Sequence, residues 1–278
     1  MIRIISDTST LYSIEEGKKI GVDITPLSVT VKGKSYVEFE EISSNQFLDL
    51  LKDGSIPISS QPAVGTKIEL YEKYSNDIII DLAMADGLSG TYQSACSARE
   101  GIAHADNIHV VNTRTLCGPH RYLLQKTVAL VKEGKGFKEI LDDVNNCMDH
   151  CKSYLIPKDF DFLKRGGRIS KVTASIGGLL KIVPIMTQTP DGTVLEKFDI
   201  KRTFKGAVES IIQSLKKMGV NEKYKLFVSH ADNLKDANIA VALLEKVFTD
   251  IEIELLDLSP AFITQGGPQC VAVQTILK

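Results

Sequence analysis

A hydroxyl-rich loop flanked by glycines is the segment whose residues are best suited to hold a ligand. Residues 87–95 read GLSGTYQSA and follow directly after the apolar run at 78–84. A strand, a loop and a helix start in that order bring unpaired backbone N–H groups and the Ser89 hydroxyl around one point. Gly87 and Gly90 also let a ligand approach the backbone closely. The loop therefore predicts an anion site; the alternative is a simple helix cap made by Ser89 or Thr91.

A second pair of hydroxyls, Ser59 and Ser60, lies between two helical patterns. Pro62 disfavours a helical conformation at Gln61, so an extended segment or a turn is expected there. Taken alone, the pair is typical of a turn with a helix cap. Beside Ser89, it would supply a second hydrogen-bond donor to the same anion.

A basic turn at residues 163–170 reads LKRGGRIS and carries three cations around two glycines. Such a turn is either a solvated loop or a docking patch for a phosphate or an acidic protein surface. The chain contains no G-x-x-x-x-G-K-[ST] motif, so nucleotide binding in that mode is not supported.

Cysteine and histidine spacing gives little support for a metal site. Cys147, His150 and Cys151 stand at i, i+3 and i+4 of a predicted helix, but no fourth ligand is evident, and packing is the favoured interpretation. No Ser-His-Asp triad is apparent from the sequence. The five cysteines are scattered, which is typical of free thiols, so no disulfide and no metal is expected.

Three short β-branched runs predict the strands that position the anion loop. They are residues 3–6, 78–83 and 108–112, with helical patterns between and after them. Alternating strands and helices indicate a parallel sheet with covered faces. Because ligands sit beyond the carboxyl ends of such strands, residues 6–9, 86–89 and 112–113 should share one rim.

The expected fold is α/β with two domains. Residues 1–153 form an N-terminal domain around the doubly wound parallel sheet, with a small β excursion at about 25–41. Residues 154–278 form a smaller α/β domain with a mixed sheet, and a ligand tunnel is expected between the domains or along them. The second domain contains an apolar segment, which is either ordinary core or the wall of a cavity for an amphipathic ligand. The wall residues are expected to be Ile176, Leu179, Leu180, Ile182 and Ile185.

Composition narrows the classes of partner. The 278 residues include 33 Lys and Arg against 35 Asp and Glu, and the net charge of -2 argues against a nucleic-acid or anionic-membrane surface. The N-terminus reaches polar residues too soon for a signal peptide, and Lys181 and Pro184 interrupt the longest apolar region. A cytoplasmic protein without stable membrane insertion is expected.

Six motifs spread over nearly the whole chain resemble those of the DegV family and occur in the family's order. They are residues 6–10 (SDTST), 26–29 (PLSV), 59–63 (SSQPA), 87–95, 163–170 and 266–268 (GGP). The resemblance implies a two-domain α/β protein that encloses one long-chain fatty acid. In FakB-type members, it further implies presentation of that acid to a separate fatty acid kinase, in the service of phospholipid synthesis through an acyl phosphate.

The resemblance also assigns residues. The carboxylate would be bound by Ser59 and Ser89, with Gly90 and Gln265 beside them, and the turn residues Arg165 and Arg168 would contact the kinase. No catalytic residue and no cofactor is implied. This chain departs from the family at Ile58-Ser59, where threonine is usual, and at Gln265, where many members have histidine. A serine hydroxyl and a glutamine amide can each still donate a hydrogen bond.

The main alternative is an enzyme, a subunit of a dihydroxyacetone-kinase-like phosphotransferase acting on a small molecule. This alternative rests on fold-level analogy with the anion loop and the strand order. Such a subunit needs a phosphate-carrying histidine beside the rim, and none of the five histidines follows the three polar loops closely in sequence. A non-enzymatic lipid carrier is therefore the favoured interpretation.

Overall fold

The computed structural model describes residues 1–170 and 182–278. Its N-terminal half is built on a four-stranded sheet in the order β2-β1-β6-β7, with every pair parallel. The three predicted strands are confirmed as β1, β6 and β7. Side chains on both faces of the central strands are buried, which explains their continuous β-branched runs. The bounds are β1 (Ile2–Asp7), β2 (Asp23–Thr25), β6 (Ile78–Ala83) and β7 (Ile108–Asn112).

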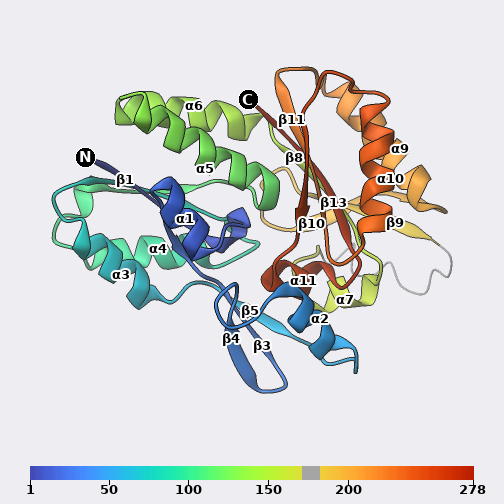
Figure 1. The fold of residues 1–278 in the computed structure, drawn as a ribbon, viewed down its shortest axis with the longest axis horizontal. Coiled ribbons are helices and arrows are strands. Elements are labelled where there is room, and N and C mark those ends of the chain that lie inside the picture. Colours follow the sequence, from blue (N-terminus) through green and yellow to red (C-terminus); the bar gives the residue numbers. More distant parts are fainter. Residues whose placement is uncertain (171–181) are drawn as a thin grey trace.

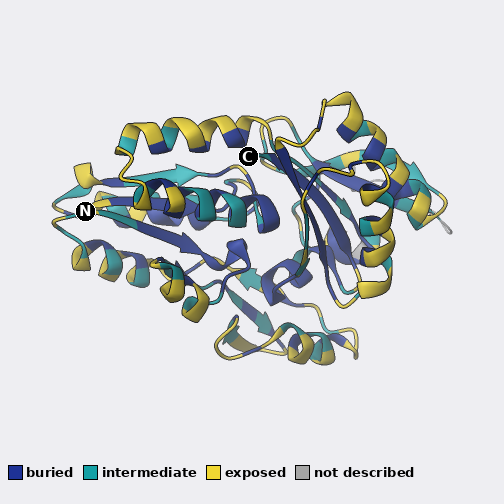
Figure 2. Ribbon diagram, turned by 45° about the horizontal axis from the view of Figure 1, so that its top comes forward, coloured by how far each residue is buried: buried dark blue, intermediate teal, exposed yellow. Residues whose placement is uncertain are grey.

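Helices cover both faces of the parallel sheet. Figure 1 shows α5 and α6 on one face and α3 and α4 on the other. Their outer surfaces are exposed while the strands between them are buried (Figure 2). The bounds in this half are η1 (Thr8–Thr10), α1 (Ile14–Ile20), α3 (Val64–Lys73), α4 (Thr91–Glu100), η2 (Ala105–Asn107), α5 (Cys117–Lys132) and α6 (Phe137–Asp149).

A small antiparallel sheet projects from the N-terminal half beside α2 (Ser44–Leu51) (Figure 1). Its order is β4-β3-β5, and it contains the excursion expected at residues 25–41. The sequence did not predict that the serine pair would join it: Ser59 pairs with Val29 and Ser60 with Ser28. The sheet therefore fixes both serines. The bounds are β3 (Ser28–Val31), β4 (Lys34–Val37) and β5 (Ile58–Ser60).

The C-terminal half contains a six-stranded mixed sheet in the order β10-β9-β8-β13-β11-β12, in which β11 and β12 alone pair in parallel. All its strands come from residues 152–277, and α5 contacts strands of both large sheets, so the division into two domains after residue 153 stays a prediction. The strands are β8 (Lys152–Ile156), β9 (Val183–Gln188), β10 (Leu195–Lys201), β11 (Tyr224–His230), β12 (Ile253–Asp257) and β13 (Val271–Leu277). The helices are α7 (Phe160–Arg165), α9 (Phe204–Lys217), α10 (Leu234–Glu245) and α11 (Pro260–Gly266).

Side chains alternate between the two faces of the mixed sheet. Ile185 and Val273 belong to the core beneath α9 and α10. Their neighbours Met186 and Ala272 point to the opposite face, which looks toward the N-terminal half. That inner face is where a cavity between the two halves can form.

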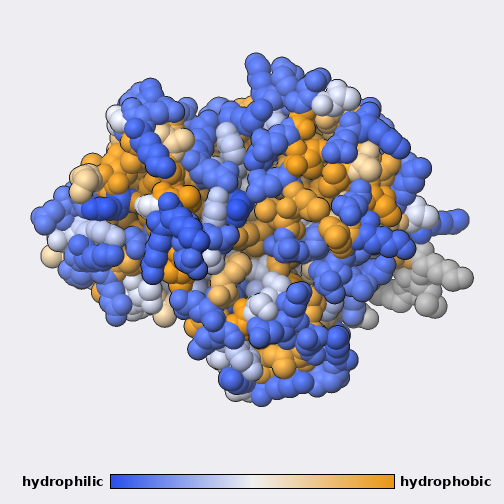
Figure 3. Space-filling view, viewed as in Figure 1, coloured by the Kyte–Doolittle hydropathy of each residue, from blue (hydrophilic) through white to orange (hydrophobic). Residues whose placement is uncertain are grey.

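No helix within residues 1–170 and 182–278 has the length and apolar character needed to cross a membrane. In Figure 3, hydrophilic side chains occupy most of the outline of the molecule, and hydrophobic side chains form separate patches in the left part, the right part and the lower lobe of the face.

Candidate functional site

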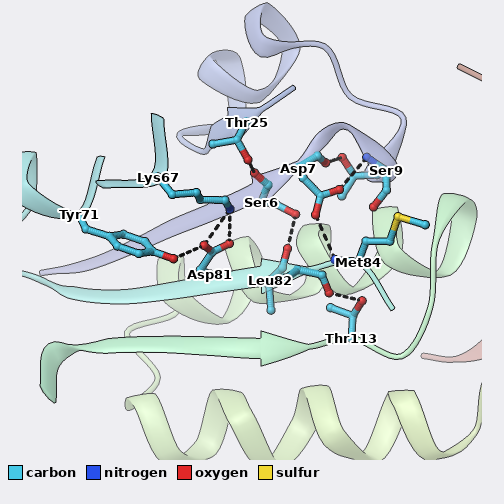
Figure 4. Close-up of polar contacts among 12 residues, drawn as sticks. Ser6, Asp7, Ser9, Thr25, Lys67, Tyr71, Asp81, Leu82, Met84 and Thr113 are labelled. Atoms are coloured by element: carbon cyan, nitrogen blue, oxygen red, sulfur yellow. Dashed lines mark hydrogen bonds and ion pairs between the residues drawn. The ribbon is translucent and has the colours of Figure 1, made fainter. Parts of the chain in front are cut away.

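The three polar loops converge at the carboxyl ends of β1, β6 and β7, as the strand order predicts. The Asp7 carboxylate accepts a hydrogen bond from the backbone N–H of Met84 (3.0 Å), and the Thr113 hydroxyl donates to the carbonyl of Ala83 (2.8 Å) (Figure 4). Residues 6–10 are almost wholly buried. They therefore stabilise the loops at the strand ends through buried hydrogen bonds and do not line a ligand surface.

Helix α5 brings a histidine to this rim that sequence proximity did not indicate. The ring of His120 lies with Nδ1 2.7 Å from the Ser9 hydroxyl and Nε2 3.3 Å from the Ser6 hydroxyl. Burial lowers the pKa of His120, which favours the neutral imidazole. The ring is fully buried, so His120 ties α5 to β1 and has no access to solvent.

A polar pocket lies beside this rim, where β5, the loop after β6 and α11 meet. All four residues expected to bind a carboxylate, Ser59, Ser89, Gly90 and Gln265, line it. They come from three separate elements, so the fold brings together what the sequence keeps far apart. The polar pocket also includes Ser60 and Gln61.

N–H groups of neighbouring residues donate to the hydroxyl oxygens of both serines. The Gln265 amide Nε2 donates to the Ser59 hydroxyl oxygen (2.9 Å). The Thr91 backbone N–H donates to the Ser89 hydroxyl oxygen (3.3 Å), and the Thr91 hydroxyl lies 2.8 Å from it. Ser89 thus caps α4 in part, although the N-cap residue itself, Gly90, makes no side-chain cap bond. Because each serine oxygen accepts from a neighbour, its O–H can donate into the polar pocket.

An apolar cavity adjoins the polar pocket, and the two share lining residues. Its walls come from both halves of the chain, and the space between them, together with the part open to solvent, is about 720 Å³. The shared residues are Met84, Leu88, Arg168, Phe262 and Gln265. A molecule with a polar head and an apolar tail can therefore occupy both spaces at once.

Two buried thiols belong to the apolar wall. Burial raises the pKa of Cys270 to about 12 and that of Cys117 well above its ordinary value. Both thiols are therefore neutral and act as small apolar groups. All five cysteines are free, and within the described ranges no three His, Cys, Asp or Glu residues form a group that could hold a metal ion.

Of the five residues expected to form the cavity wall, the structure describes two, Ile182 and Ile185, and neither lines the apolar cavity. Ile185 points into the core under α9 and α10, because alternation along β9 places Met186 on the cavity side. Ile182 lines a separate pocket with Phe204, away from this cavity. Both expectations are corrected, while Ile176, Leu179 and Leu180 lie outside the described residues.

The two arginines of the basic turn have different surroundings. Arg165 is exposed, and its guanidinium lies 5.3 Å from the centre of the Phe162 ring. Arg168, expected to be a partner contact, lines both the polar pocket and the apolar cavity. Its Nε donates to the Leu88 carbonyl (3.3 Å) and its Nη1 to the Gly166 carbonyl (2.7 Å). Backbone hydrogen bonds between residues 168–170 and Leu195 fold the turn against β10 and direct Arg168 inward.

Helix α11 is the main feature of the site that sequence reasoning missed. It carries Gln265 and also Phe262, which lines both spaces. It contacts β3, β5, α2 and α7. A signal was present: Ser259-Pro260 is a typical helix start, with proline at the first position.

Comparisons with known proteins agree with this architecture. The family model "Uncharacterised protein, DegV family COG1307" matches residues 1–278. A DegV domain-containing protein of Staphylococcus aureus is 32% identical over 250 residues, covering 89% of this chain and 87% of its own. A structure described as DegV, a fatty acid binding protein from Bacillus subtilis, aligns with a TM-score of 0.85 at 25% identity, covering 100% of this chain and 99% of that one.

A DegV family protein from Eubacterium eligens, solved loaded with heptadecanoic acid, aligns with a TM-score of 0.86 at 20% identity and covers 100% of both chains. Its likeness supports the fold, and its ligand shows that a protein of this family binds a fatty acid. Since the family model spans the whole of this sequence, and a relative that is 32% identical covers 89% of it, the chain belongs to the DegV family.

Proposed function

We propose that this protein binds a single long-chain fatty acid, with the carboxylate in the polar pocket and the acyl chain in the apolar cavity. The observation that carries the proposal is that the two spaces share five lining residues, so one amphipathic molecule can span them. The acyl chain supplies most of the affinity, because each buried methylene contributes about 0.8 kcal/mol.

The polar pocket suits a carboxylate. Ser59 and Ser89 each present an O–H, and α4 begins there with the positive end of its dipole. Arg168 adds a cation at the junction of the two spaces. Two of its five N–H groups donate to carbonyls, so three can donate to a carboxylate. Solved DegV proteins described as fatty acid binding or loaded with a fatty acid support this assignment.

The protein is further proposed to act as a carrier without catalytic residues or cofactor, presenting the bound acid to a separate fatty acid kinase for conversion to an acyl phosphate. Each serine hydroxyl donates a single hydrogen bond to the carboxylate, which leaves further lone pairs of its oxygens accessible for phosphoryl transfer. The exposed Arg165 is the proposed contact with the kinase.

Native mass spectrometry of the purified protein, before and after organic extraction, tests the proposal. The expected result is a bound mass equal to that of a common fatty acid, lost on extraction and restored when the acid is added back. A protein that carries no acid and takes up none would refute the proposed function.

A further inference from the structure

The apolar cavity ends in a row of polar side chains. Gln188, Ser153 and Gln274 lie on the adjacent strands β9, β8 and β13, and all three line the cavity. Strand β13 begins just after α11 and passes Ala272 before it reaches Gln274, so the polar row lies at the end away from α11. The next row on the same face is apolar and consists of Met186, Leu155 and Ala272.

Within the polar row, Gln274 is held firmly. Its Nε2 donates to the Ser153 hydroxyl (2.8 Å) and to the Leu116 carbonyl (3.1 Å), and its Oε1 accepts from the Gly118 N–H (3.3 Å). The side chain is 1% exposed. An acyl chain that displaced it would leave buried amide groups unsatisfied, which is costly, so Gln274 is a fixed part of the wall.

Gln188 is held more weakly and stands at a boundary. Its Nε2 donates to the Arg114 carbonyl (3.2 Å), which ties the end of β9 to the loop before α5. Among the described residues, it is the one that lines both the apolar cavity and an outer pocket formed with Arg114, Lys152 and Asp191. The outer pocket is polar, so the Gln188 side chain lies between an apolar space and a polar one.

We propose that Gln188 closes the far end of the acyl cavity and thereby sets the longest acyl chain that the protein accepts. This inference rests on the proposed function. A chain that reaches Gln188 must stop there, because further methylenes would have to displace the side chain and enter the outer pocket. Removing its bulk leaves room for further methylenes in the space that the side chain itself occupies.

The test is a competition between saturated fatty acids. Delipidated protein is equilibrated with an equimolar mixture of tetradecanoic, hexadecanoic, octadecanoic, icosanoic and docosanoic acids, and the bound acids are extracted and quantified by mass spectrometry. The wild-type chain is expected to bind acids up to a limiting length and longer ones more weakly. In Gln188→Ala the limit moves by at least two methylenes, which raises the relative retention of the first excluded acid on the order of tenfold.

Gln188→Leu is the matched control. It keeps the bulk and loses the hydrogen bond to Arg114, so it is expected to keep the wild-type limit, and thermal unfolding verifies that both variants are folded. The inference is overturned if the wild type shows no limiting length, if Gln188→Ala keeps the wild-type profile, or if Gln188→Leu relaxes it as much as alanine does. Failure of the wild type to bind any of the acids would instead overturn the proposed function.

Discussion

At the scale of single residues, the polar pocket depends on where two hydroxyl protons point. The Gln265 amide donates to the Ser59 oxygen and the Thr91 backbone N–H donates to the Ser89 oxygen, so each serine O–H can donate to a ligand. Gln265 does this without a titratable group, since its amide stays neutral. Its Oε1 is buried beside Gly166 and has no hydrogen-bond partner within the described part of the chain.

Replacing either serine by alanine removes one donor to the carboxylate. Ser59→Ala or Ser89→Ala is expected to weaken fatty acid binding by about 1.5 to 3 kcal/mol, the range for a hydrogen bond to a charged group. Titration of delipidated protein with a fluorescent fatty acid measures the change. Ser35→Ala, on the exposed strand β4, is the control and should bind like the wild type. Wild-type affinity in the Ser59→Ala, Ser89→Ala double variant would contradict the assignment.

A buried carboxyl group supports the same site from behind. Glu38 is fully buried, hydrogen-bonded to the Thr8 hydroxyl, and accepts from the Ala261 N–H at the start of α11 (2.9 Å). Burial raises the pKa of Glu38 from its ordinary value of 4.5 to about 7, and the nearby Asp7 adds to the rise. The folded protein therefore favours protonated Glu38.

The pH dependence of stability follows from this preference. The contribution of Glu38 to the free energy of unfolding is fully present below its unfolded pKa of 4.5 and is lost as the pH rises through about 7. The loss amounts to roughly 3 kcal/mol. Glu38→Gln mimics the protonated group, so relative to wild type it should gain stability between pH values of about 5 and 8. Urea unfolding of both proteins across this range measures the difference in their free energies of unfolding. The buried His120 titrates in the opposite sense, but it is present in both proteins, so its contribution cancels from the difference. A constant difference would show that Glu38 does not titrate there.

At the scale of elements, a buried ion pair joins α3 to the central strand β6. The Lys67 ammonium lies 2.7 Å from one Asp81 oxygen and 2.8 Å from the other, and the Tyr71 hydroxyl donates to Asp81 (2.6 Å) (Figure 4). All three side chains are at most 1% exposed. The pair thus fixes how α3 sits on the sheet.

Lys67→Met is expected to lower the free energy of unfolding by about 3 to 5 kcal/mol, because it leaves the Asp81 carboxylate buried with the Tyr71 hydroxyl as its remaining partner. Adding Asp81→Asn should recover most of the loss, since the amide is neutral and still accepts from Tyr71. Urea denaturation followed by circular dichroism measures both. If Lys67→Met alone were as stable as the wild type, the Asp81 carboxylate would have to form a hydrogen bond or ion pair with another group.

The elements differ in how well the sequence predicts them. The strands at 78–83 and 108–112 follow from β-branched runs, and the serine loops follow from hydroxyls placed next to strand ends. Ile185 was misplaced because a continuous apolar run does not reveal which neighbour faces which side of a sheet. The direction of Arg168 toward the ligand spaces could not be predicted, because it depends on backbone pairing with Leu195, which is distant in sequence, while its contact with a partner stays a prediction. Helix α11 is short and its role depends on tertiary contacts.

At the scale of the whole molecule, the two halves meet around the ligand spaces. Gly87 has a φ of +86°, and a Cβ there would lie 2.6 Å from the Cα of Thr193 in the β9–β10 hairpin, so glycine permits the close contact between the halves. The outer face of the basic turn remains available to another protein through Arg165.

Arg165→Ala is expected to reduce acyl phosphate formation by a fatty acid kinase on the order of tenfold at low salt, because an exposed cation steers association, while fatty acid affinity stays unchanged. Arg168→Ala should instead weaken fatty acid binding, since that side chain lines the ligand spaces. Lys217→Ala, an exposed cation on α9, is the control for net charge. Normal coupling in Arg165→Ala would exclude that residue from the interface.

The apolar cavity has walls from both halves: Leu88, Leu116 and Cys117 come from one, and Leu155, Met186 and Ala272 from the other. A cut in the connection between α6 and β8 would therefore yield two fragments, each with an apolar surface exposed to water. Neither fragment alone would enclose an acyl chain, and each would aggregate unless it bound the other fragment. Association of the two fragments would cover both apolar surfaces and rebuild the cavity at the same time.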